Sequence, residues 1–102
     1  MKITGRILSE DPVTFFAPLT DWARNLTSEY LNLEVKVDYM NTAAAKMMND
    51  LIKTLDANSH VDNKVINWYY EEDDEDMMEL GQIIEENTLN TSFFYHEMIG
   101  TL

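Results

Sequence analysis

Residues 39–46, which read Tyr-Met-Asn-Thr-Ala-Ala-Ala-Lys, mark the point where one sequence period ends and another begins. Before this junction, apolar side chains occupy every second position: Leu31, Leu33, Val35, Val37 and Tyr39. A period of two predicts a strand with one buried face. After the junction, apolar side chains recur at spacings of three and four: Ala44, Met48, Leu51, Ile52 and Leu55. That spacing predicts an amphipathic helix, which we expect to end near residues 56–59.

Two polar residues, Asn41 and Thr42, stand at the start of this predicted helix. Either side chain can cap free N–H groups of the first turn. The same N–H groups and the helix dipole favour negative charge, so a phosphate added to Thr42 would find donors there. The residues therefore leave two interpretations of Thr42 open, a helix cap and a phosphorylation site.

The rest of the chain continues the alternation of strands and helices. A short strand is predicted over residues 3–7, and residues 9–12 form a turn with Pro12 suited to the first position of a helix. Apolar residues from Phe15 to Tyr30 then follow helical spacing and are expected in the core, while Pro18 either kinks this helix or marks its start. Further strands are predicted over residues 64–70, apolar on both sides and therefore central, and over residues 93–98. We expect one α/β domain over residues 1–102, with strand and helix alternating as β-α-β-α-β-α-β and helices packed on a mixed sheet of about four strands.

Six acidic residues in a row follow the predicted third strand: Glu71, Glu72, Asp73, Asp74, Glu75 and Asp76. Apolar residues at helical spacing come next, so the run is predicted to form the strand exit and the first turn of a third helix. Negative charge is favourable at that place because of the helix dipole. A solvated helix start, a protein-docking patch and a calcium or magnesium site remain open, although the run lacks the spacing and the glycine of an EF-hand loop.

The net charge of −12 over 102 residues argues against direct binding of nucleic acids or anionic membranes, which would repel the protein. It suits partners with a basic surface.

The chain has no cysteine, which excludes disulfides and thiolate chemistry. No stretch has the length of a membrane span and the first residues lack a signal-peptide pattern, so we expect a cytoplasmic protein.

Residue patterns of catalysis are not evident in the sequence. His60 and His96 have no serine or cysteine at a recognisable spacing, and no glycine-rich phosphate loop is present among only three glycines. We therefore expect no enzymatic activity, no cofactor and no metal.

Four stretches carry a resemblance to the SiaC-type regulatory phosphoproteins of bacteria: SEDP at 9–12, FF at 15–16 with Pro18 and Trp22 after it, YMNT at 39–42, and NWYYEEDDEDM at 67–77. The resemblance extends over nearly the whole chain. It implies a small cytosolic α/β protein without catalytic activity, similar in architecture to anti-sigma factor antagonists of the STAS type. The family usually has serines after the threonine, whereas this chain has Ala43, Ala44 and Ala45, so Thr42 is the one hydroxyl in the motif.

The resemblance further implies that a dedicated kinase phosphorylates Thr42 and that a PP2C-type phosphatase removes the phosphate. The unmodified form would bind and activate a diguanylate cyclase, which raises cyclic-di-GMP and favours biofilm. We expect the partner-binding residues to be Asn41, Thr42, Glu71, Glu72, Asp73, Asp74, Glu75 and Asp76. Two alternatives stay open, an anti-sigma factor antagonist switched at Thr42 and a small acidic metal binder or enzyme that uses residues 71–76.

Overall fold

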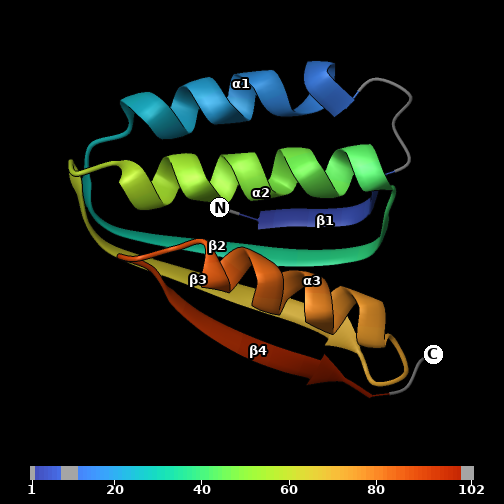
Figure 1. Ribbon diagram of the computed structural model, residues 1–102. Helices are drawn as coiled ribbons and strands as arrows, with labels where there is room; N and C mark the ends of the chain where they lie inside the picture. The colour runs from blue at the N-terminus through green and yellow to red at the C-terminus, as the bar shows by residue number, and fades with distance from the viewer. Residues whose placement is uncertain (1, 8–11, 100–102) are drawn as a thin grey trace.

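Strands and helices alternate along the chain in the computed structural model, which describes residues 2–7 and 12–99, with side chains described for residues 16–37 and 41–99. The elements are β1 (Lys2–Ile7), α1 (Pro12–Asn25), β2 (Ser28–Met40), α2 (Thr42–Ala57), β3 (Val61–Glu71), α3 (Glu75–Glu86) and β4 (Ser92–Met98). Within these residues the strands form one four-stranded sheet in the order β1-β2-β3-β4 (Figure 1). The chain thus adds each new strand beside the previous one.

All three strand pairs of the sheet are parallel. The mixed sheet predicted from the sequence is therefore wrong. The physical reason is that every connection between neighbouring strands contains a helix, which carries the chain back to the start of the next strand. Right-handed crossovers in a sequential strand order place the helices on the same face of the sheet (Figure 1).

The core lies between that face and the helices. Alternate side chains of β2 are buried there, namely Leu31, Leu33, Val35 and Val37, and they meet the apolar stripe of α2. The helical period of α2 is thus confirmed, and so is the alternation of β2 from Leu31 to Val37, whereas the side chain of Tyr39 lies outside the described ones. β3 contributes the fully buried Trp68 and lies between β2 and β4, as its apolar character predicted.

Close contact between α3 and β3 depends on Gly81. A Cβ atom at Gly81 would lie 2.7 Å from Nε1 of Trp68, so only glycine lets the helix approach the indole ring this closely. The same Nε1 group donates a hydrogen bond to the carbonyl of Met77 at 2.9 Å. The N–H group of the buried indole therefore has a hydrogen-bond acceptor, and this bond holds the first turns of α3 on the sheet.

Helix α1 differs in part from its predicted form. It begins at Pro12, as predicted, and it continues through Pro18, so Pro18 does not mark the helix start. The apolar stripe buries Phe16 and Ala23, but the helix ends at Asn25, and Trp22 and Tyr30 are 37% and 58% exposed. The prediction that the stripe continues through Tyr30 into the core is therefore wrong, because Tyr30 lies in β2 on the face away from the helices. Of the predicted turn at 9–12, residues 9–11 lie outside the described residues.

Candidate functional site

The first turn of α2 resolves which residue caps the helix. Asn41 has an extended backbone, with φ −75° and ψ 172°, and its side-chain oxygen accepts a hydrogen bond from Ala44 N. This bond is 2.8 Å long, and the carbonyl of Asn41 also accepts from Ala45 N at 2.9 Å. Asn41 is thus the N-cap, and the interpretation of Thr42 as the cap is wrong.

Thr42 is the first helical residue, and its side chain is exposed. The N–H groups of the first helical turn have no carbonyl partner within the helix, which leaves the amides of Thr42 and Ala43 beside the Thr42 hydroxyl. Lys46 is exposed one turn further along, at the i+4 spacing from which side chains meet on a helix surface. Thr42 and Lys46 are thus two exposed residues on the same face of the first turns of α2.

The acidic run forms the turn between β3 and α3, as predicted. Glu71 is the last residue of β3, and Asp74 caps α3 by accepting a hydrogen bond from Met77 N at 3.0 Å. Glu75 and Asp76 stand in the first turn of the helix. Five of these six acidic side chains are exposed, whereas that of Asp74, which caps the helix, is half-buried.

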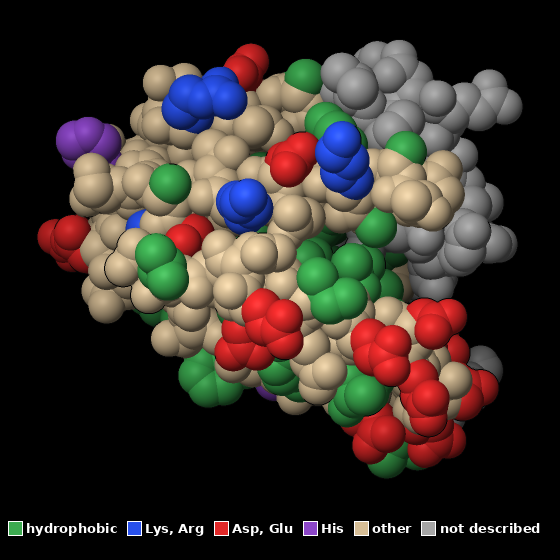
Figure 2. Space-filling model, viewed as in Figure 1, with side chains coloured by type: hydrophobic (Ala, Val, Ile, Leu, Met, Phe, Trp, Pro, Cys, Tyr) green, Lys and Arg blue, Asp and Glu red, His purple; other side chains and the backbone are tan. Residues whose placement is uncertain are grey.

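Carboxylates consequently gather at one corner of the molecule. Figure 2 shows this corner over the start of α3, whereas the Lys and Arg side chains visible on the same face lie over α1 and α2. The turn is attached to the last strand, because Glu72 N donates to the carbonyl of Met98 at 3.1 Å.

Thr42 and the acidic turn lie on the same rim of the sheet. β2 and β3 are parallel neighbours, so the ends at Met40 and Glu71 point in the same direction. Asn41 and Thr42 follow the first end, and the acidic run follows the second. This rim is the place where α/β proteins commonly bind their ligands and partners. The structure thus brings the predicted site residues to one rim, in two groups that follow adjacent strands.

The two histidines are held by structural contacts. His96 stacks on Tyr69 with ring centroids 4.6 Å apart, and its Nε2 atom lies 2.7 Å from Oδ1 of Asn67. His60 is exposed in the turn before β3, where its backbone N–H donates to Oδ1 of Asn58. Among the described residues, no group of three His, Asp or Glu side chains is placed to hold a metal ion. No described helix is long and apolar enough to cross a membrane.

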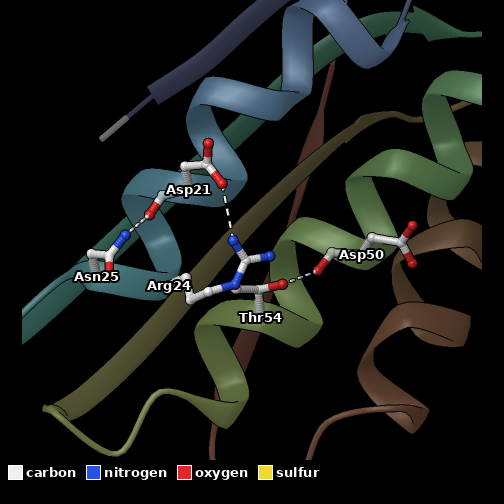
Figure 3. A network of polar contacts seen from close by, with 5 residues as sticks. All are labelled: Asp21, Arg24, Asn25, Asp50 and Thr54. Atoms are coloured by element: carbon white, nitrogen blue, oxygen red, sulfur yellow. Dashed lines mark hydrogen bonds and ion pairs between the residues drawn. The ribbon is translucent and has the colours of Figure 1, made fainter.

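A groove between α1 and α2 was not predicted from the sequence. Its volume is about 600 Å³, and its lining residues are Ala17, Thr20, Asp21, Arg24, Met47, Asp50, Lys53, Thr54 and Ala57. Arg24 pairs with Asp21 at 2.9 Å, and Thr54 donates to the carbonyl of Asp50 (Figure 3). Each of these two contacts joins residues of the same helix, so their spacing in the sequence can indicate the contacts. The groove lies between two helices, and no spacing within one helix indicates it.

Asp56, near the end of α2, is a second feature without a sequence signal. Its carboxylate is 7% exposed and accepts hydrogen bonds from Leu89 N, Asn90 N and the Thr91 hydroxyl, at 3.0, 2.7 and 2.7 Å. Burial raises the pKa of Asp56, but these hydrogen bonds and the charge of Lys64 outweigh burial and hold the pKa below its ordinary value. Asp56 therefore anchors, as a carboxylate, the loop that leads into β4.

Comparison with known proteins places this architecture in a family. The sequence matches the family described as SiaC family regulatory phosphoprotein over residues 1–98. The chain belongs to the SiaC family. The Asn41–Thr42 junction and the acidic turn that carried the resemblance both lie inside the matched region of this SiaC-family chain. The comparison with curated proteins finds no matching sequence.

Solved structures of SiaC from Pseudomonas aeruginosa have the same fold as this SiaC-family chain. A chain in the crystal structure of the diguanylate cyclase SiaD in complex with its activator SiaC is 20% identical, with a TM-score of 0.74, and the match covers 93% of this chain and 82% of that one. A structure of SiaC alone is 20% identical, with a TM-score of 0.70 and coverage of 93% and 80%. The crystal structure of apo-SiaC is 21% identical, with a TM-score of 0.72 and coverage of 93% and 79%.

Proposed function

We propose that this chain is a non-catalytic cytoplasmic signalling protein that binds and regulates a diguanylate cyclase and is switched by reversible phosphorylation of Thr42. Membership of a regulatory phosphoprotein family supports the general role, and a fold shared with the SiaC structures supports the class of partner. The observation that carries the site is the exposed Thr42 side chain at the first position of α2, beside a helix that Asn41 already caps.

Because Asn41 supplies the cap, modification of Thr42 does not remove a hydrogen bond that the helix start needs. A phosphoryl group adds about −1.5 to −2 charge and three strong acceptor oxygens. The dipole and the free N–H groups at the helix start favour that charge, so we expect the fold to tolerate it. The effect of the phosphate is then on binding and not on folding.

The partner face in this proposal is the rim that carries Asn41, Thr42 and the acidic turn at residues 71–76. A partner that fits a neutral threonine beside six carboxylates presents basic groups to the turn and a close-fitting surface to the hydroxyl. A phosphate on Thr42 adds bulk and a buried or mispaired charge at that surface, and like-charge contacts at an interface cost several kcal/mol. A kinase and a PP2C-type phosphatase acting on Thr42 complete the switch.

The test compares charge at Thr42 with the same charge elsewhere on the surface. Thr42→Glu is measured against wild type for binding to the purified diguanylate cyclase from the same cell, by calorimetry. Thr27→Glu is the matched control, because Thr27 is exposed in the connection between α1 and β2, at the opposite end of the sheet. We expect Thr42→Glu to weaken binding at least about tenfold, equal to about 1.4 kcal/mol, and Thr27→Glu to leave it unchanged.

Circular dichroism melts of both variants establish that the fold is intact. Binding of Thr42→Glu as tight as that of wild type would show that this residue is not the switch. Equal weakening by both glutamates would assign the effect to net charge, which also contradicts the proposal.

A further inference from the structure

The last strand, β4, has a free edge. Within the described residues it pairs only with β3, and it stands at the end of the sheet (Figure 1). The carbonyl of Met98 accepts from Glu72 N, so the backbone groups of Met98 point toward β3. In a strand, the N–H and C=O groups of one residue point to the same side, and those of the next residue point to the opposite side. The N–H and C=O groups of Phe93, Tyr95 and Glu97 therefore point outward, away from the sheet.

Natural sheets usually protect such an edge with lysine, proline or a bulge. Ser92–Met98 contains no lysine or proline, its register with β3 is continuous from Ser92 to Met98, and its one carboxylate is that of the exposed Glu97. Exposed apolar side chains accompany the free edge instead. Phe94 is 53% exposed in the strand, and Leu89 and Ile99 just outside it are 92% and 78% exposed. The edge thus has the features of a strand that pairs with another chain.

The charges around β4 are of one sign. Lys64 is the last basic residue of the sequence, and ten of the 19 acidic residues follow it. Helix α3 holds its exposed carboxylates close to the strand, since the Tyr95 hydroxyl donates to Glu85 Oε1 at 2.6 Å. Burial and this carboxylate also raise the pKa of Tyr95, so the hydroxyl keeps its proton and the contact persists. A segment that lies along β4 would therefore lie in a field of negative charge.

We propose that the free edge of β4 binds an extended basic segment of a partner protein as a fifth strand of the sheet. Its backbone would pair with the outward groups of Phe93, Tyr95 and Glu97, and its Lys or Arg side chains would face the carboxylates of α3. A second copy of this chain is the disfavoured occupant, because it would bring an equal acidic surface and a net charge of −12 to the same edge. The β4 edge does not include Thr42, so the inference is tested independently of the phosphorylation switch, although the end of β4 at Met98 adjoins the acidic turn of the proposed partner face.

Two synthetic peptides of equal length and charge serve as probes, one alternating Lys and Val and the other alternating Lys and Pro. The Lys-Pro peptide keeps the charge but cannot pair as a strand. Amide hydrogen exchange is followed by NMR during titration with each peptide. We expect the Lys-Val peptide to slow exchange at Phe93, Tyr95 and Glu97 by about tenfold or more, with smaller changes at Phe94 and His96, because those amides already face β3.

A pair of variants separates strand pairing from general attraction. Phe94→Lys adds a positive charge at the edge, and Ile83→Lys adds the same charge on the exposed surface of α3. We expect Phe94→Lys to weaken binding of the Lys-Val peptide several-fold more than Ile83→Lys does. If the two peptides slowed amide exchange equally, or if the two variants weakened peptide binding equally, the binding would be explained by charge alone and the proposal would be overturned. Protection of Phe93 and Tyr95 that increases with protein concentration, without peptide, would overturn it in favour of a second copy.

Discussion

Replacement of Asp56 by alanine removes the anchor of the loop that leads into β4. Three donors converge on the wild-type carboxylate, from Leu89, Asn90 and Thr91. A hydrogen bond to a charged group contributes about 1.5–3 kcal/mol. Leu89 and Asn90 are exposed, so water can satisfy part of what the variant loses. We therefore expect Asp56→Ala to lower the free energy of unfolding by about 2–4 kcal/mol, a large fraction of the 5–15 kcal/mol typical of a domain.

The expected loss depends on pH with a definite sign. The folded-state pKa of Asp56 lies below its ordinary value of 3.8, so the folded state binds fewer protons at this group than the unfolded state does. The stabilisation by the carboxylate is then present above that ordinary, unfolded-state pKa and disappears as the pH falls through the lower folded-state value. The difference in stability between wild type and Asp56→Ala should be largest near pH 7 and shrink below about pH 4.

The assay is urea denaturation followed by tryptophan fluorescence, near pH 7 and near pH 3. Asp62→Ala is the matched control, because Asp62 is an exposed carboxylate in the following strand, and surface substitutions of this kind change stability by about 0.5 kcal/mol or less. If Asp56→Ala and Asp62→Ala unfold at the same urea concentration near pH 7, the Asp56 anchor does not stabilise the loop.

Two more substitutions test local features of the fold. Gly81→Ala should destabilise the protein by about 1–2 kcal/mol, because the new Cβ would lie 2.7 Å from Trp68 Nε1 and overpacking outweighs the gain in helix propensity. Thermal melts check this, with Gln82→Ala as the exposed control in α3, and a melting temperature equal to that of the control would contradict the expected close packing. Asn41→Ala should cost about 1 kcal/mol by removing the acceptor of Ala44 N, whereas Asn41→Ser should retain most of the stability. Equal loss in both Asn41 variants would show that the cap is not the cause.

Local features of this protein could be predicted because their causes lie within a few residues. The change of period around Asn41 and Thr42 gave the boundary between β2 and α2. The acidic run at 71–76 indicated a helix start, since carboxylates are favourable at that end of the helix dipole. The common rim of Thr42 and the acidic turn depends in addition on the parallel pairing of β2 and β3, which the structure shows.

The choice between two neighbouring caps, and the contacts between residues far apart in the chain, could not be predicted in the same way. Asn41 and Thr42 are both suitable caps in a sequence, and the backbone of the first turn decides between them. Lys64 is one charged residue of a predicted strand in the sequence, whereas in the structure it is buried and its Nζ atom donates to the carbonyl of Asp56 at 2.7 Å. The exposure of Trp22 likewise depends on how α1 lies against α2, which no spacing within α1 records.

The amino-acid sequence by itself determined the order of strands and helices, the apolar faces of β2 and α2, and that the charge after Lys64 is entirely negative, because these properties follow from periodicity and composition. Only the tertiary structure decided that every strand pair is parallel, that α2 is capped by Asn41, and that β4 keeps a free edge. The physical reason is that strand pairing and burial are contacts between groups far apart in the chain. The choice of cap is made between two neighbouring residues that can both serve. The free energies of these contacts depend on three-dimensional packing, which local patterns do not contain.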